Sequence, residues 1–135
     1  DQMLFKRVAS LKDYTTICNS APSEFLATIA LRQRARILAR NLEIIKKNLA
    51  LLEDFFARRR ALFFWRRPAA GPIAFPRLHV EEGADAFCSS LARKAGVLLL
   101  PSSVYEHGNS HVRIGFGRAN MPEALARLDE YLDNY

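Results

Sequence analysis

The chain has 135 residues, of which 50% are apolar and 25% are charged. This length and composition predict one globular domain with a single core, and they exclude disordered and fibrous proteins. No apolar stretch approaches the roughly 18 residues of a membrane span, and the start DQMLFKR has no signal-peptide pattern, so we expect a cytoplasmic protein without membrane contact. The net charge of +6 is compatible with an acidic partner such as nucleic acid.

Two helical segments open the chain. Residues 3–13 carry apolar side chains at helical spacing, and the polar stretch TTICNS that follows predicts a loop. Ser20 is suited to cap a second helix. Pro22 and Glu24 suit the first turn of that helix, because free N–H groups and the positive end of the helix dipole lie there.

The second helical pattern continues to about residue 58. Its apolar residues recur at alternating steps of four and three: Leu31, Ala35, Leu38, Leu42, Ile45, Leu49, Leu52 and Phe56. A single helix over this stretch would be about 55 Å long, whereas a compact domain of this size is about 30 Å across. We therefore expect the helix either to kink or to reach another part of the protein.

Two strands are predicted after the basic run Arg58-Arg59-Arg60, which ends the helix and favours its negative pole. The segment ALFFWRR is rich in aromatic residues, PAAGP is a turn, and IAFPRLHV is the second strand. Pro76 lies inside this second strand and indicates an edge position or a bulge, because proline donates no hydrogen bond.

A third helix is predicted over residues 84–95. Phe87 and Leu91 face inward in this helix, and Gly96 follows its last turn as a left-handed cap. The short run VLLL, which ends at Pro101, predicts a buried strand.

The last two elements are the strand HVRIGFGR, which follows a loop over 102–110, and a helix over NMPEALARLDEYL. Asn120 and Glu123 form an N-x-x-E capping pattern at the start of that helix. The order of elements predicts an α+β fold of two layers, in which a small, mostly antiparallel sheet is covered by helices.

The cysteines, histidines and serines give weak signals for chemistry. Cys18 and Cys88 are isolated and are interpreted as reduced, partly buried thiols rather than a disulfide or a zinc site. Glu106, His107 and His111 lie across a glycine-containing loop without the fixed spacing of metal ligands, so no metal is expected. Ser102 and Ser103 are close to His107 in sequence, but this proximity does not establish a nucleophile and base, and no catalytic residue is assigned.

The arginines Arg32, Arg36 and Arg40 of the long helix lie mostly off its apolar stripe. Their simplest interpretation is a solvated face. The alternative function is a basic interaction module that binds nucleic acid or another acidic partner through this face.

Arg113 has unusual surroundings on its strand. Side chains alternate along a strand, so Val112, Ile114 and Phe116 share the core face, while Arg113 shares the other face with two glycines. The missing side chains leave room for a planar group to approach the guanidinium, whose fork of N–H donors matches a carboxylate. Exposure at a sheet edge, or a pair with an internal acid such as Glu106, stays open as the structural interpretation.

Several motifs together resemble the C-terminal part of class I/II pyridoxal-phosphate (PLP)-dependent aminotransferases, the aspartate aminotransferase superfamily of fold type I. The motifs are KDYTTICNSAPSEFLATIAL, the RN-x-x-I-x-x-N-x-x-L helix with Asn41 and Asn48, the turn from Trp65 to Gly71, GVLLLPSS, and HVRIGFGR with its following helix. They occur in order over nearly the whole chain.

This resemblance implies a role for Arg113, since the arginine of the R-I-G-F-G strand binds the substrate α-carboxylate in the family. It implies that residues 1–20 end the large domain or connect to it, and that residues 21–135 form the small domain, preceded by a long interdomain helix. It further implies PLP as cofactor, an amino acid and a 2-oxo acid as substrates, and a homodimer in which the Tyr14–Ser23 segment lies near the partner's site. Nucleic acid and membrane are not expected partners on this interpretation.

Two departures from the family pattern qualify the expected activity. Pro101-Ser102-Ser103 stands where the family often has P-G-S, and the S-K stretch that carries the cofactor lysine is not present. The chain's lysines have other surroundings: Lys6, Lys12, Lys46, Lys47 and Lys94. We therefore expect a fragment of an aminotransferase that is inactive alone, with no catalytic or cofactor-binding residue of its own. A related PLP reaction, such as cyclisation or decarboxylation, shares the carboxylate clamp and stays open.

Overall fold

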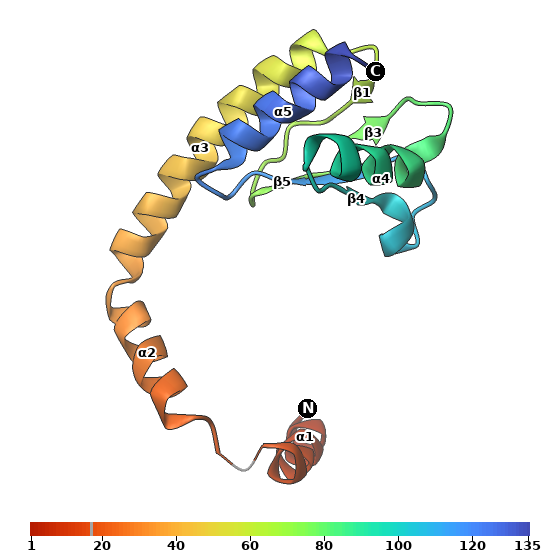
Figure 1. Cartoon of the computed structure of the whole chain (residues 1–135). Helices are drawn as coiled ribbons and strands as arrows, with labels where there is room; N and C mark the ends of the chain where they lie inside the picture. The colour runs from red at the N-terminus through yellow and green to blue at the C-terminus, as the bar shows by residue number, and fades with distance from the viewer. Residues whose placement is uncertain (17) are drawn as a thin grey trace. The chain divides into compact units, whose positions relative to one another are not determined.

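A computed structural model describes residues 1–16 and 18–135 of the chain (Figure 1). The chain divides into two compact units, unit 1 (Asp1–Ala39) and unit 2 (Arg40–Tyr135). Every described residue of unit 1 is exposed to solvent, so its helices have no buried core of their own. The hydrophobic core of the chain lies in unit 2.

Unit 1 contains both helices predicted for the start of the chain. They are α1 (Gln2–Thr15) and α2 (Ala21–Arg32). Ser20 occupies the N-cap position of α2 as predicted, but its side chain makes no capping hydrogen bond. The predicted loop TTICNS includes Ile17, which lies outside the described residues.

The helical pattern predicted to about residue 58 is interrupted once, because Gln33 separates α2 from α3 (Arg34–Arg58). The Gln33 backbone has φ −96° and ψ 11°. Its N–H donates to the Ile29 carbonyl at 3.0 Å, and its own carbonyl accepts from the Ile37 N–H at 3.1 Å. Helical hydrogen bonding thus continues on both sides of the turn, which corresponds to the kinked alternative.

Only the later part of the predicted apolar stripe is core. Leu52 and Phe56 of α3 are buried, and Ile45 and Leu49 pack against the core as partly buried residues. Earlier residues of the stripe are exposed, with Leu31 at 70%, Leu38 at 58% and Leu42 at 51%. The stripe was therefore a correct helix prediction but an incomplete guide to burial.

The strands of unit 2 form two small antiparallel sheets (Figure 1). β1 (Phe63–Phe64) pairs with β3 (Arg77–Leu78). In the three-stranded sheet, β5 (Val112–Gly115) lies between β2 (Ile73–Ala74) and β4 (Leu100–Pro101). The fold class predicted from the sequence, α+β with helices over a small antiparallel sheet and a long helix before the strands, is confirmed.

Pro76 divides the predicted strand over 73–80 into β2 and β3, which belong to different sheets. Proline has no N–H for a strand ladder, and the Pro76 carbonyl accepts a hydrogen bond from the Val112 N–H at 3.1 Å. The predicted edge position is correct for β2, which is an outer strand of the three-stranded sheet. The predicted buried strand VLLL is also shorter than expected, since only its last residue enters β4 and Leu98 is 76% exposed.

The remaining helices are α4 (Gly83–Ala95), the short 3₁₀ helix η1 (Ser102–Tyr105) and α5 (Met121–Asp133). Gly96 ends α4 in the left-handed conformation with φ 66°, as predicted. Asn120 is at the N-cap position of α5, but the predicted capping box is wrong. Its side chain makes no capping bond, and the helix's Glu123 pairs instead with an arginine one turn later.

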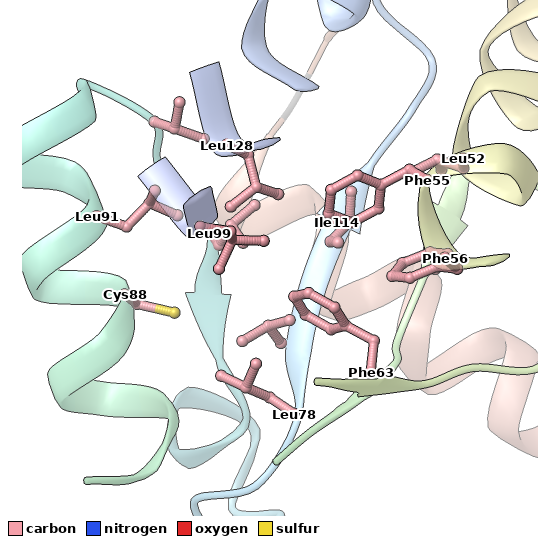
Figure 2. Close-up of a cluster of buried hydrophobic side chains, with 14 of the residues drawn as sticks. Leu52, Phe55, Phe56, Phe63, Leu78, Cys88, Leu91, Leu99, Ile114 and Leu128 are labelled. Atoms are coloured by element: carbon pink, nitrogen blue, oxygen red, sulfur yellow. The ribbon is translucent and has the colours of Figure 1, made fainter. Parts of the chain in front are cut away.

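The core lies between the helices and one face of the sheets (Figure 2). It contains fully buried side chains from α3, α4, β5 and the segment after β5: Leu52, Phe55, Phe87, Leu91, Val112 and Phe116. In Figure 2, Ile114 of β5 points toward the same cluster as Leu128 of α5 and Phe55 of α3. This packing covers the face of β5 that carries Val112 and Ile114.

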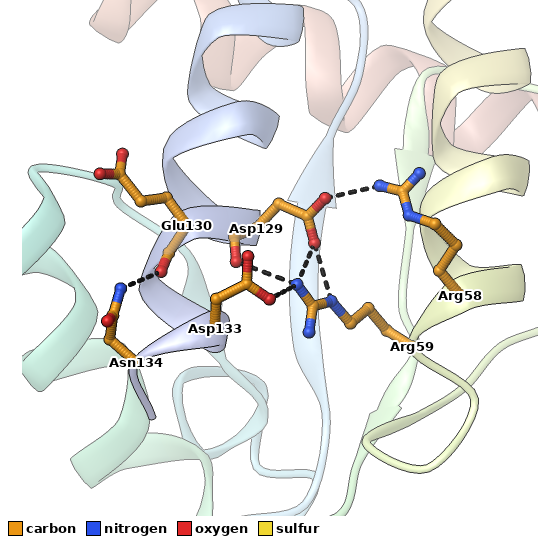
Figure 3. A network of polar contacts seen from close by, with 6 residues as sticks. All are labelled: Arg58, Arg59, Asp129, Glu130, Asp133 and Asn134. Atoms are coloured by element: carbon orange, nitrogen blue, oxygen red, sulfur yellow. Dashed lines mark hydrogen bonds and ion pairs between the residues drawn. The ribbon is translucent and has the colours of Figure 1, made fainter.

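An ion-pair network joins the end of α3 to α5 (Figure 3). Arg59 Nε donates to Asp129 Oδ1 at 2.7 Å, and its Nη2 contacts Asp133 Oδ1 at 2.5 Å, while Arg58 contacts the other oxygen of Asp129. Burial opposes ionisation of Asp129, but the hydrogen bonds from Arg59 and Arg58 outweigh it and hold its pKa below the ordinary value. Arg58 is the last residue of α3, as predicted; its acidic partners on α5 were not foreseen.

Candidate functional site

β5 places Arg113 on the face of the sheet opposite the core. Val112 and Ile114 are 0% and 5% exposed, whereas Arg113 is half-buried and Gly115 is exposed. The predicted alternation along this strand is therefore confirmed. β5 is the central strand of its sheet, so the alternative of an exposed edge position for Arg113 is wrong.

The surroundings of Arg113 are apolar on both neighbouring strands. Leu100 of β4 is its register partner, and Ile73 of β2 is the partner of Gly115. Among the described residues, the Arg113 side chain forms no ion pair or hydrogen bond, so the suggested pair with Glu106 is not made. An unpaired guanidinium beside apolar neighbours is a potential anion-binding group.

The two glycines beside Arg113 serve different purposes. A Cβ added to Gly115 would meet nothing within 4 Å, which agrees with the predicted free space on this face. A Cβ added to Gly117 would lie 3.0 Å from the Pro72 Cβ. Gly117 is therefore required by close packing, and it does not contribute to the predicted free space.

Arg113 lines a cleft of about 550 Å³. The walls come from residues 96–100, from β5 and the segment after it, and from the first turns of α5. Arg118 and Asn120 also line this cleft, and its lining includes no carboxylate. Arg118, which lies beyond the end of β5, thus shares the cleft with Arg113. Its volume and mixed lining are those of a small-molecule site with a positive charge.

A buried asparagine of α3 holds the segment that follows β5. Asn48 is 3% exposed, and its Nδ2 donates to the carbonyls of Phe116 at 2.9 Å and Arg118 at 2.8 Å. The Phe116 N–H also donates to the Pro72 carbonyl at 2.8 Å. Sequence reasoning gave Asn48 no role, although a polar residue three positions after Ile45 on a buried stripe is a signal for one.

The serines near His107 make structural hydrogen bonds. Ser102 is fully buried, donates to the Gly108 carbonyl at 2.9 Å and accepts from the Ser110 and His111 N–H groups. Ser103 Oγ donates to an Asp85 carboxylate oxygen at 2.5 Å. These bonds give both hydroxyls partners other than a histidine base.

His107 and His111 lie close together, with ring centroids 5.1 Å apart. The His111 ring stacks on Phe75 at 5.2 Å, and burial, with further contributions from His107 and Arg77, lowers the pKa of His111. Within residues 1–16 and 18–135, no group of three or more acidic, histidine or cysteine side chains is placed to hold a metal ion.

The two cysteines differ in environment. Burial raises the pKa of the Cys88 thiol to about 11, with a smaller contribution from Asp85. Both cysteines are free thiols, but Cys18 is exposed and Cys88 is buried, so the predicted partial burial is wrong for both.

The lysines do not fit the covalent anchor of PLP. A Schiff-base lysine requires a desolvated or electropositive pocket that favours its neutral form. All five lysines of the chain are exposed: Lys6, Lys12, Lys46, Lys47 and Lys94. We therefore assign no reaction step of the cofactor to this chain.

The arginines Arg32, Arg36 and Arg40 are exposed, as the interpretation of a solvated face expects. A basic interaction module on this face would show binding that falls steeply with salt. None of the helices in the described part of the chain has both the length and the apolar character that a membrane span requires.

Comparison with solved structures identifies the fold. An aminotransferase from Streptococcus suis that depends on PLP is 30% identical over 94% of this chain and 34% of its own, with a TM-score of 0.84. The PLP-dependent cyclase OrfR is 25% identical over 93% of this chain and 35% of its own, with a TM-score of 0.82. An aminotransferase from Mycobacterium tuberculosis is 28% identical over 96% of this chain and 35% of its own, with a TM-score of 0.76.

No protein-family model and no curated protein sequence matches the chain. The structural neighbours nevertheless belong to one class, the PLP-dependent enzymes, and the chain shares their fold over 93–96% of its length. Within this class its fold is the aspartate aminotransferase fold, which confirms the resemblance indicated by the sequence motifs. The chain spans about a third of the length of these neighbours.

Proposed function

We propose that this chain supplies the substrate-carboxylate site of a PLP-dependent aminotransferase, which transfers an amino group between an amino acid and a 2-oxo acid. Arg113 binds the carboxylate. The observation that carries this proposal is the half-buried, unpaired Arg113 guanidinium in a cleft whose lining includes no carboxylate. Residues 21–135 belong to the C-terminal small domain, and residues 1–20 belong to the connection with the large domain.

The physical role of Arg113 is orientation of the substrate. Its planar guanidinium can donate two parallel hydrogen bonds to one carboxylate, which fixes both the position and the direction of the bound group. Partial burial reduces screening by water and strengthens this contact. A fixed carboxylate also orients the substrate Cα–H bond for cleavage by groups outside this chain.

PLP is the proposed cofactor of the complete enzyme, and its lysine and ring-holding residues are proposed to lie outside these 135 residues. When bound, PLP supplies the electron sink for the reaction. The exposed lysines of this chain support the proposal that the chain alone is inactive. The complete enzyme is proposed to be a cytoplasmic homodimer in amino-acid metabolism, with the Tyr14–Ser23 segment near the partner's site.

The test of the proposal uses Arg113→Ala. In the complete enzyme this change is expected to weaken substrate engagement by about 2–5 kcal/mol, because a desolvated carboxylate is left without its partner. Steady-state kinetics measure the effect as a loss of kcat/KM. Kinetics within about threefold of wild type would overturn the assignment of Arg113.

A second candidate reaction is PLP-dependent cyclisation, which the similarity to the cyclase OrfR favours at 25% identity. Both reactions use the same carboxylate site, so Arg113→Ala does not separate them. Product analysis with the complete enzyme does. Amino-group transfer gives a new amino acid from a supplied 2-oxo acid, whereas cyclisation gives a ring product without consuming one.

A further inference from the structure

We propose that Asn48 is a positioning residue of the Arg113 cleft. Its side chain acts on the backbone that forms one wall of the cleft, and through this wall on the carboxylate that Arg113 binds. The inference rests on the proposed function of Arg113 as a carboxylate-binding residue.

Asn48 is a polar residue in a buried, apolar part of α3, and its hydrogen-bond partners are distant in sequence. It lies on the buried face of α3, between the half-buried Ile45 and the fully buried Leu52, and is itself 3% exposed. A carboxamide in such a place is costly unless its hydrogen bonds are made. Its two N–H donors reach backbone carbonyls 68 and 70 residues further along the chain.

The acceptors belong to the segment that leaves β5 immediately after the strand residue Gly115. The Phe116 and Arg118 carbonyls lie on either side of Gly117, so the carboxamide of Asn48 bridges one turn of backbone. Pro72 contacts the same segment through the Phe116 N–H, and it leaves no free space for a Cβ at Gly117.

The clamped segment is a wall of the cleft. Gly115 precedes it and Asn120 follows it, and both line the cleft together with Arg113 and Arg118. The direction of the Arg113 side chain depends on the direction of β5, and that of Arg118 depends directly on a backbone unit that Asn48 holds. Without the carboxamide, both cationic residues lose a fixed backbone support.

The experiment uses the 135-residue chain with sodium benzoate as the carboxylate probe, because the cleft combines a cation with apolar walls. Benzoate affinity is measured by NMR from the shift of the Gly115 backbone N–H signal, because Gly115 lines the cleft and is present in every variant. Sodium chloride is exchanged for benzoate at constant ionic strength, since screening changes the strength of exposed charge contacts. Arg113→Ala defines the signal that does not arise from the proposed site.

Two variants remove the donors of Asn48 in different ways. Asn48→Ala deletes the carboxamide, and Asn48→Asp keeps its shape but replaces the donor nitrogen with an acceptor. Asn41→Ala is the matched control, because Asn41 lies two turns earlier on the same helix, is half-buried, and makes no side-chain hydrogen bond among the described residues. Each affinity is measured at a temperature where the variant is folded.

We expect the benzoate affinity to fall about tenfold in both Asn48 variants and to change less than twofold in Asn41→Ala. Folded Asn48 variants with affinity within twofold of wild type would overturn the proposal. If wild-type benzoate binding does not depend on Arg113, the proposed function fails, and the inference fails with it. If benzoate binding depends on Arg113 but is unchanged in the Asn48 variants, the inference on Asn48 fails and the proposed function of Arg113 is unaffected.

A measurement on the wild-type chain tests the same coupling without a variant. Linkage requires that a ligand favoured by the Asn48 contacts also strengthens these contacts, by the same factor. Saturating benzoate is therefore expected to slow hydrogen exchange of the Asn48 side-chain NH₂ by about tenfold. An unchanged exchange rate in the presence of Arg113-dependent binding would overturn the proposal, whether or not the variants fold.

Discussion

The glycines that follow Arg113 are expected to respond in opposite ways to alanine. Gly115→Ala adds a Cβ that meets nothing within 4 Å, and the position does not need a left-handed backbone. Gly117→Ala places a Cβ 3.0 Å from the Cβ and 3.5 Å from the Cγ of Pro72. The Pro72 carbonyl also accepts the Phe116 N–H at 2.8 Å, so the ring cannot retreat without weakening this bond.

The expected magnitudes follow from these contacts. Gly115→Ala lowers the backbone entropy of the unfolded chain, so we expect the free energy of unfolding to stay equal or to rise by up to about 1 kcal/mol. Gly117→Ala overpacks a rigid contact, so we expect a loss of about 1–3 kcal/mol. Urea unfolding followed by circular dichroism measures both, and the m-value is expected to stay constant because the surface exposed on unfolding is unchanged.

A double variant identifies the cause. Pro72→Gly removes the Cβ that a new side chain at position 117 would contact, and it should therefore recover part of the loss when combined with Gly117→Ala. Equal effects of Gly115→Ala and Gly117→Ala would refute the distinction between open space and close packing. A Gly117→Ala protein within about 0.3 kcal/mol of wild type would refute the packing argument itself.

Three further outcomes are expected. The ion pairs of ionised Asp129 stabilise the fold above the ordinary pKa of this carboxyl, and this stabilisation is lost as the pH falls through its lowered folded pKa. In Asp129→Asn the urea midpoint should therefore depend less on pH in the acidic range than in wild type. His111, whose folded pKa is lowered, is neutral in the stable fold, so stability should begin to fall as the pH drops below about 6.5, and less so in His111→Phe. A thiol reagent at pH 8 should modify the exposed Cys18 rapidly, as measured by mass spectrometry. The buried Cys88, whose pKa is raised to about 11, should react only on unfolding.

Periodicity predicted the elements whose pattern is set by their own residues. The alternation of Val112, Arg113 and Ile114 has the period of a strand, and burial follows this pattern in the structure. Gly96 was predicted as a left-handed cap because few other residues adopt that conformation without strain, and its φ is 66°. The alternation along β5 was sufficient to place Arg113 on the face away from the core.

Local patterns were less reliable where the backbone had alternative partners. The break at Gln33 has no proline or glycine to mark it, and helical hydrogen bonds continue on both sides. Asn120 and Glu123 match a capping box, yet Glu123 forms an ion pair with Arg127 at 2.8 Å instead. The start of α5 was predictable from the sequence, whereas the partner of Glu123 was not.

The walls of the cleft depend on contacts that no local pattern describes. Asn48 reaches its acceptors across 68 and 70 residues, and Arg59 reaches Asp129 across 70. The first contact comes from α3 and the second from the residue that follows α3, and both end on the chain after β5. The position of α3 therefore affects the cleft wall and α5 together. The chemistry of the ligand can be inferred from Arg113 alone, because a guanidinium selects an anion. The strength of binding also depends on how rigidly α3 holds that wall, and this is why an asparagine far from Arg113 in sequence is expected to change carboxylate affinity.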